Sequence, residues 1–156
     1  MQDTTGSYLI AIAMTAVLTI ITVAMHYEAL RLISAIHPRR WSGKVNIGAM
    51  IVLIIAAHCV EAMMFGLGYW LGTDVFHVGS LKGMPDHGTA AYIYFSLETF
   101  TTQSIGDIFP VGPLRLLAAV EPVVGLMLIG WSTSFTFLQM RRDWRADDAG
   151  EVDDSA

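Results

Sequence analysis

Three long apolar runs dominate the pattern of hydrophobic and polar positions along the chain. They cover residues 8–25, 45–71 and 112–140. The shortest run has 18 residues, which as a helix spans ~27 Å and nearly matches the hydrocarbon core of a bilayer. Hydrophobic residues make up 54% of the chain and charged residues 15%, a balance too apolar for a small soluble domain. The pattern therefore predicts an all-α protein that lies in the lipid bilayer and crosses it with three transmembrane helices.

The positions of the cations predict the orientation of these helices. Lys and Arg are enriched in cytoplasmic loops, and here they gather beside the first connection and after the last run, as Arg31, Arg39, Arg40, Lys44, Arg141, Arg142 and Arg145. The N-terminus and the connection between residues 71 and 112 are then expected outside. Since the N-terminus lacks the cations of a secretory signal, the first run should remain as an anchor. We expect an integral protein of the plasma (inner) membrane, with the N-terminus outside and the C-terminus cytoplasmic.

The chain divides into three parts. Residues 1–44 hold the first helix and a basic cytoplasmic loop, residues 45–142 form a two-span module, and residues 143–156 are an acidic tail expected to be disordered. The single cysteine, Cys59, excludes an intrachain disulfide. No nucleophile–base set and no phosphate-binding loop is recognisable, so an enzyme, a resident cofactor, a nucleic-acid partner and a soluble regulatory domain are not expected.

A polar segment between the second and third runs carries a recognisable motif. From Ser96 to Pro110 it reads S-x-E-T-x-T-T-x-x-x-G-D-x-x-P. A short helix is predicted over residues 91–101, followed by an irregular turn at 102–107. This arrangement resembles the pore helix and selectivity filter of the potassium-channel pore family, whose filter reads T-V-G-Y-G. The corresponding positions in this chain are Thr102, Gln103, Ser104, Ile105 and Gly106.

The resemblance covers residues 47–140 and leaves the first span outside. It implies a re-entrant pore helix and filter loop between two spans, and a homotetramer, because the ring of coordinating carbonyls is four-fold. It also implies a gating hinge in the last span at Gly125, and we expect the nearby Pro122 to belong to the same hinge. The cavity below the filter would be lined by Leu126, Ile129 and Thr133. The implied function is passive transport of monovalent cations, with potassium or sodium as the bound ion.

Three filter positions depart from the family pattern. Ser104 replaces a glycine, and an L-residue in the left-handed region costs ~1–2 kcal/mol. Ile105 replaces an aromatic residue that packs outward and holds the carbonyl ring at its diameter. Gln103 replaces an aliphatic residue. These departures predict a shorter or wider filter that conducts cations without strict selectivity for potassium.

Two carboxyl groups flank the turn. In similar channels the residue at the position of Glu98 lies behind the filter and bonds the one at the position of Asp107. Two desolvated carboxyls at close range cannot both ionise cheaply, so one pKa should be raised. The alternative is that Asp107 only caps a turn. Both interpretations place negative charge near the entrance, which favours cations.

A second group of ionisable residues falls inside the apolar runs. His58 and Glu61 lie three residues apart on one helix face, and Glu121 lies at a similar depth on the last run. We consider three roles for a cluster of these residues: a proton-sensing site, a metal site, and a polar contact that fixes helix packing. His26, which follows the first run, is expected at the headgroup region.

Three functions remain open. The first is a tetrameric cation channel of the potassium-channel pore type. The second is a non-conducting membrane scaffold or accessory subunit that keeps the fold. The third is a membrane metal-binding protein that uses His58, Glu61 and Glu121.

Overall fold

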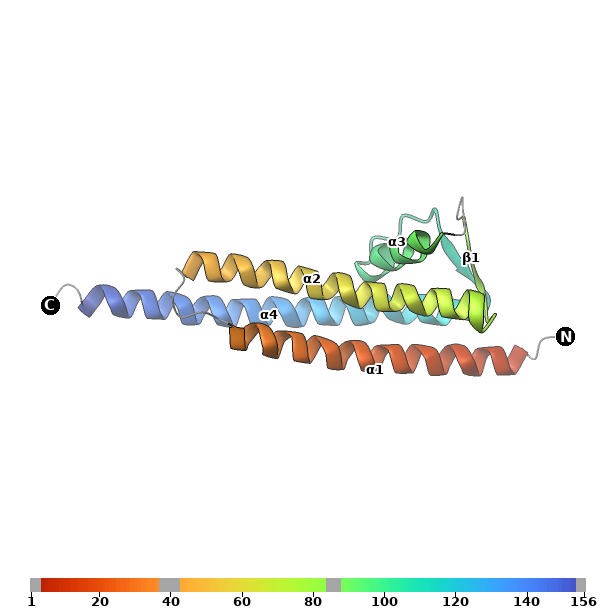
Figure 1. Ribbon diagram of the computed structural model, residues 1–156, viewed down its shortest axis with the longest axis horizontal. Helices are drawn as coiled ribbons and strands as arrows, with labels where there is room; N and C mark the ends of the chain where they lie inside the picture. The colour runs from red at the N-terminus through yellow and green to blue at the C-terminus, as the bar shows by residue number, and fades with distance from the viewer. Residues whose placement is uncertain (1–3, 37–42, 84–87, 154–156) are drawn as a thin grey trace.

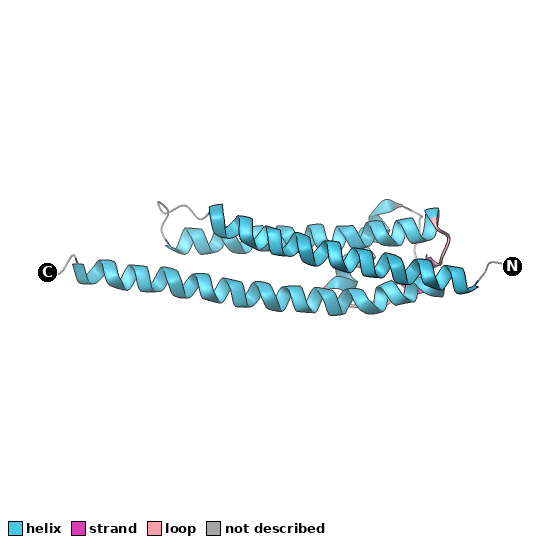
Figure 2. Ribbon diagram, turned by 90° about the horizontal axis from the view of Figure 1, so that it is seen from below, coloured by secondary structure: helices cyan, strands magenta, loops and turns pink. Residues whose placement is uncertain are grey.

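Three long helices lying side by side make up most of the molecule (Figures 1 and 2). The computed structural model describes residues 4–36, 43–83 and 88–153. The long helices are α1 (Thr4–Ile36), α2 (Gly43–Trp70) and α4 (Arg115–Asp153). Three stretches are long and apolar enough to cross a membrane: Thr5–Ala35 within α1, Val45–Val75 over α2 and the turn after it, and Gly112–Arg142 over α4 and the turn before it. The prediction of three candidate membrane-spanning helices is confirmed.

The helices place most of the described cations at one end of the bundle. The N-terminus lies at the opposite end from the C-terminus, from the end of α1 and from the start of α2 (Figure 1). At the C-terminal end the Gln139 side chain donates a hydrogen bond to Ser34 Oγ, 3.2 Å away. Ser34 borders the same groove as Arg141, Arg142 and Arg145. Most of the predicted basic loop, residues 37–42, lies outside the described residues.

A short folded segment connects α2 to α4 at the N-terminal end of the bundle. It comprises a π-helical turn (Leu71–Val75), β1 (Ser80–Lys82), α3 (Thr89–Phe100), β2 (Phe109–Val111) and a 3₁₀ turn (Gly112–Leu114). The strands pair antiparallel, with Leu81 opposite Pro110. The all-α prediction missed this sheet because strands of three residues are too short to show an alternating pattern. The predicted helix over 91–101 is present as α3 and begins two residues earlier.

The main core forms where α2, α3 and α4 meet. Its fully buried side chains include Phe65 and Tyr69 from α2, Phe100 from α3, Leu114 from the 3₁₀ turn and Leu117 from the start of α4. The rings of Tyr69 and Phe95 pack edge to face, with centroids 4.9 Å apart. A smaller cluster of Leu30, Met50 and Ile54 occupies the other half of the bundle. The core therefore holds α3 against the N-terminal half of the bundle.

Helix α3 runs from the end of the bundle toward its middle (Figure 1). Its backbone at Ile93 lies 3.2 Å from where a Cβ would stand on Gly66. Its last residue, Phe100, has its ring 6.0 Å from that of His58. Gly66 and His58 are eight residues apart on α2, or ~12 Å along the helix axis. The residues after Phe100 therefore begin deep in the bundle, and the chain returns from there to β2.

Helix α4 differs from its prediction in two respects. It continues as a helix to Asp153, where a disordered tail was expected from residue 143. The segment contains helix-favouring Ala, Arg and Glu residues, so an existing helix can extend through it; residues 154–156 lie outside the described residues. The helix is also continuous through Pro122 and Gly125, the two residues proposed as a hinge.

Gly125 lies at a close contact between α4 and α3. A Cβ at this position would collide with the carbonyl oxygen of Phe100. By contrast, a Cβ on Gly130 would meet no atom within 4 Å. The absence of a side chain at Gly125 therefore lets the end of α3 approach α4. This packing role is separate from the predicted role of Gly125 as a hinge.

We predict that Gly125→Ala lowers the free energy of unfolding, because the added methyl group must displace the end of α3. Overpacking of this kind costs about 1–3 kcal/mol. Gly130→Ala is the matched control, and it should be neutral or stabilising by up to about 1 kcal/mol because alanine favours the helix. Equilibrium unfolding of both variants in the same detergent tests this. Equal effects of the two substitutions would show that the α3–α4 contact does not require glycine.

Candidate functional site

The turn after α3 has an unusual backbone. Among the described residues, three non-glycine residues have positive φ: His77 at 50°, Thr102 at 60° and Ser104 at 42°. Gly106 follows with φ of 86°. Left-handed conformations thus recur at every second residue of the predicted filter, 102, 104 and 106. For a β-branched residue such as Thr102 this conformation is rare and strained.

Hydrogen bonds from α3 hold the start of this turn. The Thr101 hydroxyl donates to Leu97 O over 2.7 Å. The backbone N–H groups of Gln103 and Ser104 both point to Glu98 O, at 2.7 and 3.4 Å. The left-handed residues therefore follow directly from the way in which the helix ends.

Ser104 has left-handed backbone, with φ of 42°. The cost of left-handed backbone at this residue was one reason to expect an altered filter, yet Ser104 adopts that conformation. A Cβ on Gly106 would meet no atom within 4 Å. Glycine is therefore favoured at this position by the positive φ and not by a lack of space. Residues 101–107 are all exposed on the single chain, and Ile105 is 60% exposed.

The charges of Glu98 and Asp107 act on each other, and Tyr94 interacts with both carboxyls. Glu98 is buried, and its Oε2 has no hydrogen-bond partner within the described part of the chain. Burial first, and then the charge of Asp107, raise the pKa of Glu98, while hydrogen bonds from the Ile105 backbone and the Tyr94 hydroxyl lower it. The Tyr94 hydroxyl interacts with both carboxyls. Sequence reasoning missed Tyr94, although it lies one turn before Glu98 on α3.

The capping role considered for Asp107 is also present. Asp107 Oδ1 accepts a hydrogen bond of 2.8 Å from the backbone N–H of Ile108. The same side chain interacts with Glu98. The two interpretations of Asp107 are therefore compatible.

Glu121 lies in a separate hydrogen-bonded group from His58 and Glu61. It is fully buried, with the Tyr69 hydroxyl and Ser96 Oγ each 2.5 Å from a carboxyl oxygen. Ser96 Oγ lies equally close, 2.5 Å, to the carbonyl oxygen of Ala62. Serine has one hydroxyl hydrogen, so both contacts are hydrogen bonds only when Glu121 is protonated and donates to Ser96. The group joins α2, α3 and α4 at one point.

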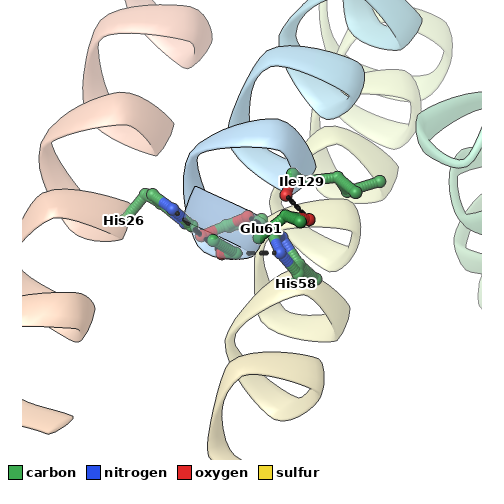
Figure 3. Close-up of polar contacts among 6 residues, drawn as sticks. His26, His58, Glu61 and Ile129 are labelled. Atoms are coloured by element: carbon green, nitrogen blue, oxygen red, sulfur yellow. Dashed lines mark hydrogen bonds and ion pairs between the residues drawn. The ribbon is translucent and has the colours of Figure 1, made fainter. Parts of the chain in front are cut away.

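His26 takes the place that the sequence prediction gave to Glu121. Its Nδ1 lies 2.7 Å from Glu61 Oε1, and His58 Nδ1 lies 2.8 Å from Glu61 Oε2 (Figure 3). The Ser132 hydroxyl lies 3.1 Å from Nε2 of His58 and 3.4 Å from Nε2 of His26. The two imidazole rings are stacked, with centroids 5.2 Å apart. His26 and Glu61 are fully buried.

His26 was expected at the headgroup region, and its side chain is fully buried between α1 and α2. It belongs to a buried stripe on α1, whose members recur at spacings of four or seven: Ala11, Thr15, Thr22, His26 and Leu30. This spacing places them on one helix face. Two threonines and a histidine on that face of an apolar run were the signal for a polar contact with another helix.

The predicted cavity positions border two different grooves. Ile129 and Thr133 line a groove of ≈ 360 Å³ between α2 and α4, together with His58 and Ser132. Leu126 lines another groove that includes Val23 of α1. The Thr133 hydroxyl donates to Ile129 O over 2.9 Å, a bond within the helix that also suits a lipid-facing position.

No family model, curated protein or solved structure matches this chain. Its function is therefore inferred from the residues and from their geometry.

The raised pKa of Glu98 predicts a pH-dependent stability. A carboxyl whose folded-state pKa is raised stabilises the fold below its unfolded value and loses that contribution as the pH rises through the folded value. We expect the unfolding temperature of the wild type to fall as the pH rises above 4.5, the ordinary value of this group. Glu98→Gln lacks this titration and should show a smaller fall. Thermal unfolding in detergent across this range measures both.

The matched control for this comparison is Glu28→Gln. Glu28 is an exposed carboxylate on α1 that pairs with Arg31, their charged atoms 2.8 Å apart. Its variant should keep the pH profile of the wild type at acid and neutral pH. A Glu98→Gln profile parallel to that of the wild type would contradict the raised pKa.

Proposed function

We propose that the chain forms a tetrameric cation channel of the potassium-channel pore type. The observation that carries this proposal is the recurrence of left-handed backbone at Thr102, Ser104 and Gly106. Alternating backbone conformations let successive carbonyl groups point to the same side, which is how a filter replaces the hydration shell of an ion. Left-handed backbone at two L-residues, Thr102 and Ser104, is a source of strain, and strain of this kind is typical of functional segments.

The path of the chain supports a re-entrant loop. α3 runs from the end of the bundle to the level of His58, and the chain then returns to β2 at the same end. Both flanking helices are candidate membrane spans. In a bilayer, irregular backbone at this depth must be buried in protein or line water. Since residues 101–107 are exposed on the single chain, other copies of the chain would supply that cover.

Four copies would bring four filter segments around one axis. One segment per chain and a four-fold ring of carbonyls lead to this number. The exposed apolar side chains around the segment, Tyr94, Leu97 and Ile105, would then contact neighbouring copies. The tetramer thus accounts for both the strained polar backbone and the apolar side chains next to it.

Cations would cross passively through this assembly. They would enter at Asp107, pass the carbonyls of residues 102–106, and reach a cavity bordered by Ile129 and Thr133. A bend of α4 near Gly125 would change its contact with Phe100 and thereby the base of the filter. The cations at the C-terminal end favour a cytoplasmic C-terminus and an outer filter in the plasma membrane.

A non-conducting scaffold is the second candidate, and it is favoured by the residues at positions 103 and 105. Gln103 and Ile105 lack the side chains that usually support the ring. A flux measurement separates the two candidates.

The proposal predicts a homotetramer in the membrane. Native mass spectrometry of the protein, released from nanodiscs or a mild detergent, should show four copies of the chain. Crosslinking within native membranes before extraction provides an independent count. A chain that is monomeric or dimeric by both methods would contradict the proposed pore.

Liposomes containing the purified protein should pass potassium or sodium ions. Asp107→Ala should reduce the flux several-fold because it removes negative charge at the entrance. Gly106→Ala should also reduce it, because left-handed backbone costs an L-residue ~1–2 kcal/mol. Gly48→Ala is the matched control: a Cβ at Gly48 in α2 meets no atom within 4 Å. Initial rates under potassium, sodium and calcium gradients give the comparison.

The selectivity of the flux tests the departures in the filter. Comparable potassium and sodium flux would support an altered filter. Potassium flux without sodium flux would show that Gln103 and Ile105 still permit a family-like ring. No flux under any gradient or pH, with the tetramer intact, would overturn the channel in favour of the scaffold.

A further inference from the structure

We propose that His26, His58 and Glu61 bind a divalent transition-metal ion, with zinc preferred, inside the membrane-spanning bundle. The ligand atoms of these side chains all lie within 4.8 Å of one another. His26 comes from α1 and the other two residues come from α2, and both histidines are directed at the carboxyl group of Glu61 (Figure 3). Metal binding and ion conduction are separate properties, so this site does not depend on the proposed channel.

The distances leave room for an ion after a small adjustment. Nδ1 of His26 and Nδ1 of His58 lie 2.7 and 2.8 Å from the two oxygens of Glu61. Around tetrahedral zinc, with bonds of ~2.0–2.2 Å, neighbouring donor atoms lie ~3.4 Å apart. The histidine–glutamate separations therefore need to widen by less than ~1 Å. Two histidines and a glutamate are a donor set that zinc uses when one position stays open.

Ser132 supplies the outer contacts that metal-bound histidines require. Coordination through Nδ1 leaves the ring proton on Nε2, and this proton normally has an acceptor. Both Nε2 atoms face the Ser132 hydroxyl, at 3.1 and 3.4 Å. A hydroxyl oxygen has two acceptor lone pairs, so Ser132 can accept a hydrogen bond from each ring.

With two neutral rings and an ionised Glu61, the metal-free cluster is one hydrogen-bond donor short. If both neutral rings donate from Nδ1 to an ionised Glu61, both Nε2 atoms are acceptors facing Ser132. Ser132 has one hydrogen to donate, so one buried nitrogen is left without a donor. Either a proton on one ring or a metal ion at the Nδ1 atoms removes this deficit. The proton is therefore the competing occupant.

The surroundings of the cluster favour a metal ion with a small fourth ligand. Thr22, one turn before His26 on the same face of α1, is fully buried, and its hydroxyl has no hydrogen-bond partner among the described residues. The groove lined by His58 and Ser132 gives access from the side of α2 and α4. A hydroxide as the fourth ligand would make the site neutral, as a low-dielectric interior requires. Imidazole donors select zinc-like ions over magnesium or calcium.

The site gives α1 a role. The resemblance to a pore module leaves α1 outside and gives it no function. A metal bound by His26 and by the α2 residues would join α1 to the pore module, and Ser132 would extend the connection to α4. Removal of the ion should then loosen α1 more than the remaining helices.

Metal content after loading tests the proposal directly. The full-length protein in detergent is incubated with zinc, separated from free metal by gel filtration, and analysed by mass spectrometry of the metal. We expect one zinc per chain in the wild type and at least a ten-fold weaker affinity in Glu61→Gln and His26→Ala. The matched controls are Glu121→Gln, a buried carboxyl in the separate group, and Cys59→Ser, which removes the single thiol. Both should keep one zinc per chain.

Cobalt gives a readout that does not depend on a loss of binding. Cobalt in the wild-type site should show the visible absorption of a tetrahedral ion without thiolate bands. His58→Cys should add a thiolate-to-cobalt charge-transfer band, because the new donor would belong to the site. Zinc bound equally by wild type and Glu61→Gln, or no stoichiometric metal in a folded wild type, would overturn the proposal and leave the proton as the occupant.

Discussion

The placement of α3 depends on one buried carboxyl group. Glu121 of α4 contacts the Tyr69 hydroxyl of α2 and the Ser96 hydroxyl of α3, each at 2.5 Å. An isolated polar group in an apolar interior costs several kcal/mol unless it is hydrogen-bonded, so these three helices are held in one relative position. The close contact of Gly125 with Phe100 lies one turn further along α4. Together the two contacts determine where α3 ends and where the strained turn begins.

Two buried clusters of polar side chains connect different sets of helices. The Glu121 group lies nearer the N-terminal end and positions α3, whereas Glu61, His26 and His58 lie deeper and connect α1 to α2. Each carboxyl is shared between helices that are far apart in sequence, which gives the apolar bundle a specific register. Apolar contacts alone specify helix register weakly in lipid, because lipid tails are as apolar as the side chains.

Much of the fold was predictable because the hydrophobicity that indicates a membrane-spanning helix is averaged over many residues. Three apolar runs of sufficient length required three helices, and a short helix was expected before the polar turn. The two-stranded sheet was not predictable, because Leu81 and Pro110 pair only after the chain between them has folded back. The continuation of α4 to Asp153 was also missed, because net acidity was weighed above the helix propensity of its residues.

The candidate site was predicted less completely, for a physical reason. The pair His58–Glu61 was found because both residues lie on one turn of one helix. The third member could not be chosen by depth alone, since His26 and Glu121 come from different helices whose rotation about their axes is set by packing. The buried stripe on α1 contained that information, as threonines and a histidine at spacings of four or seven. Tyr94 was missed for a similar reason, because an exposed aromatic on α3 gave no sign of two carboxyl partners.

The pairing of β1 with β2 has a consequence for the strained turn. It closes the chain from Lys82 to Phe109 into a loop whose ends are fixed beside each other. Closing such a loop costs entropy once, and the cost grows only slowly with its length. Afterwards Thr102 and Ser104 cannot relax by moving the segment as a whole, because both of its ends are tied at the same edge of the bundle. The sheet thus fixes both ends of the segment that carries the left-handed residues.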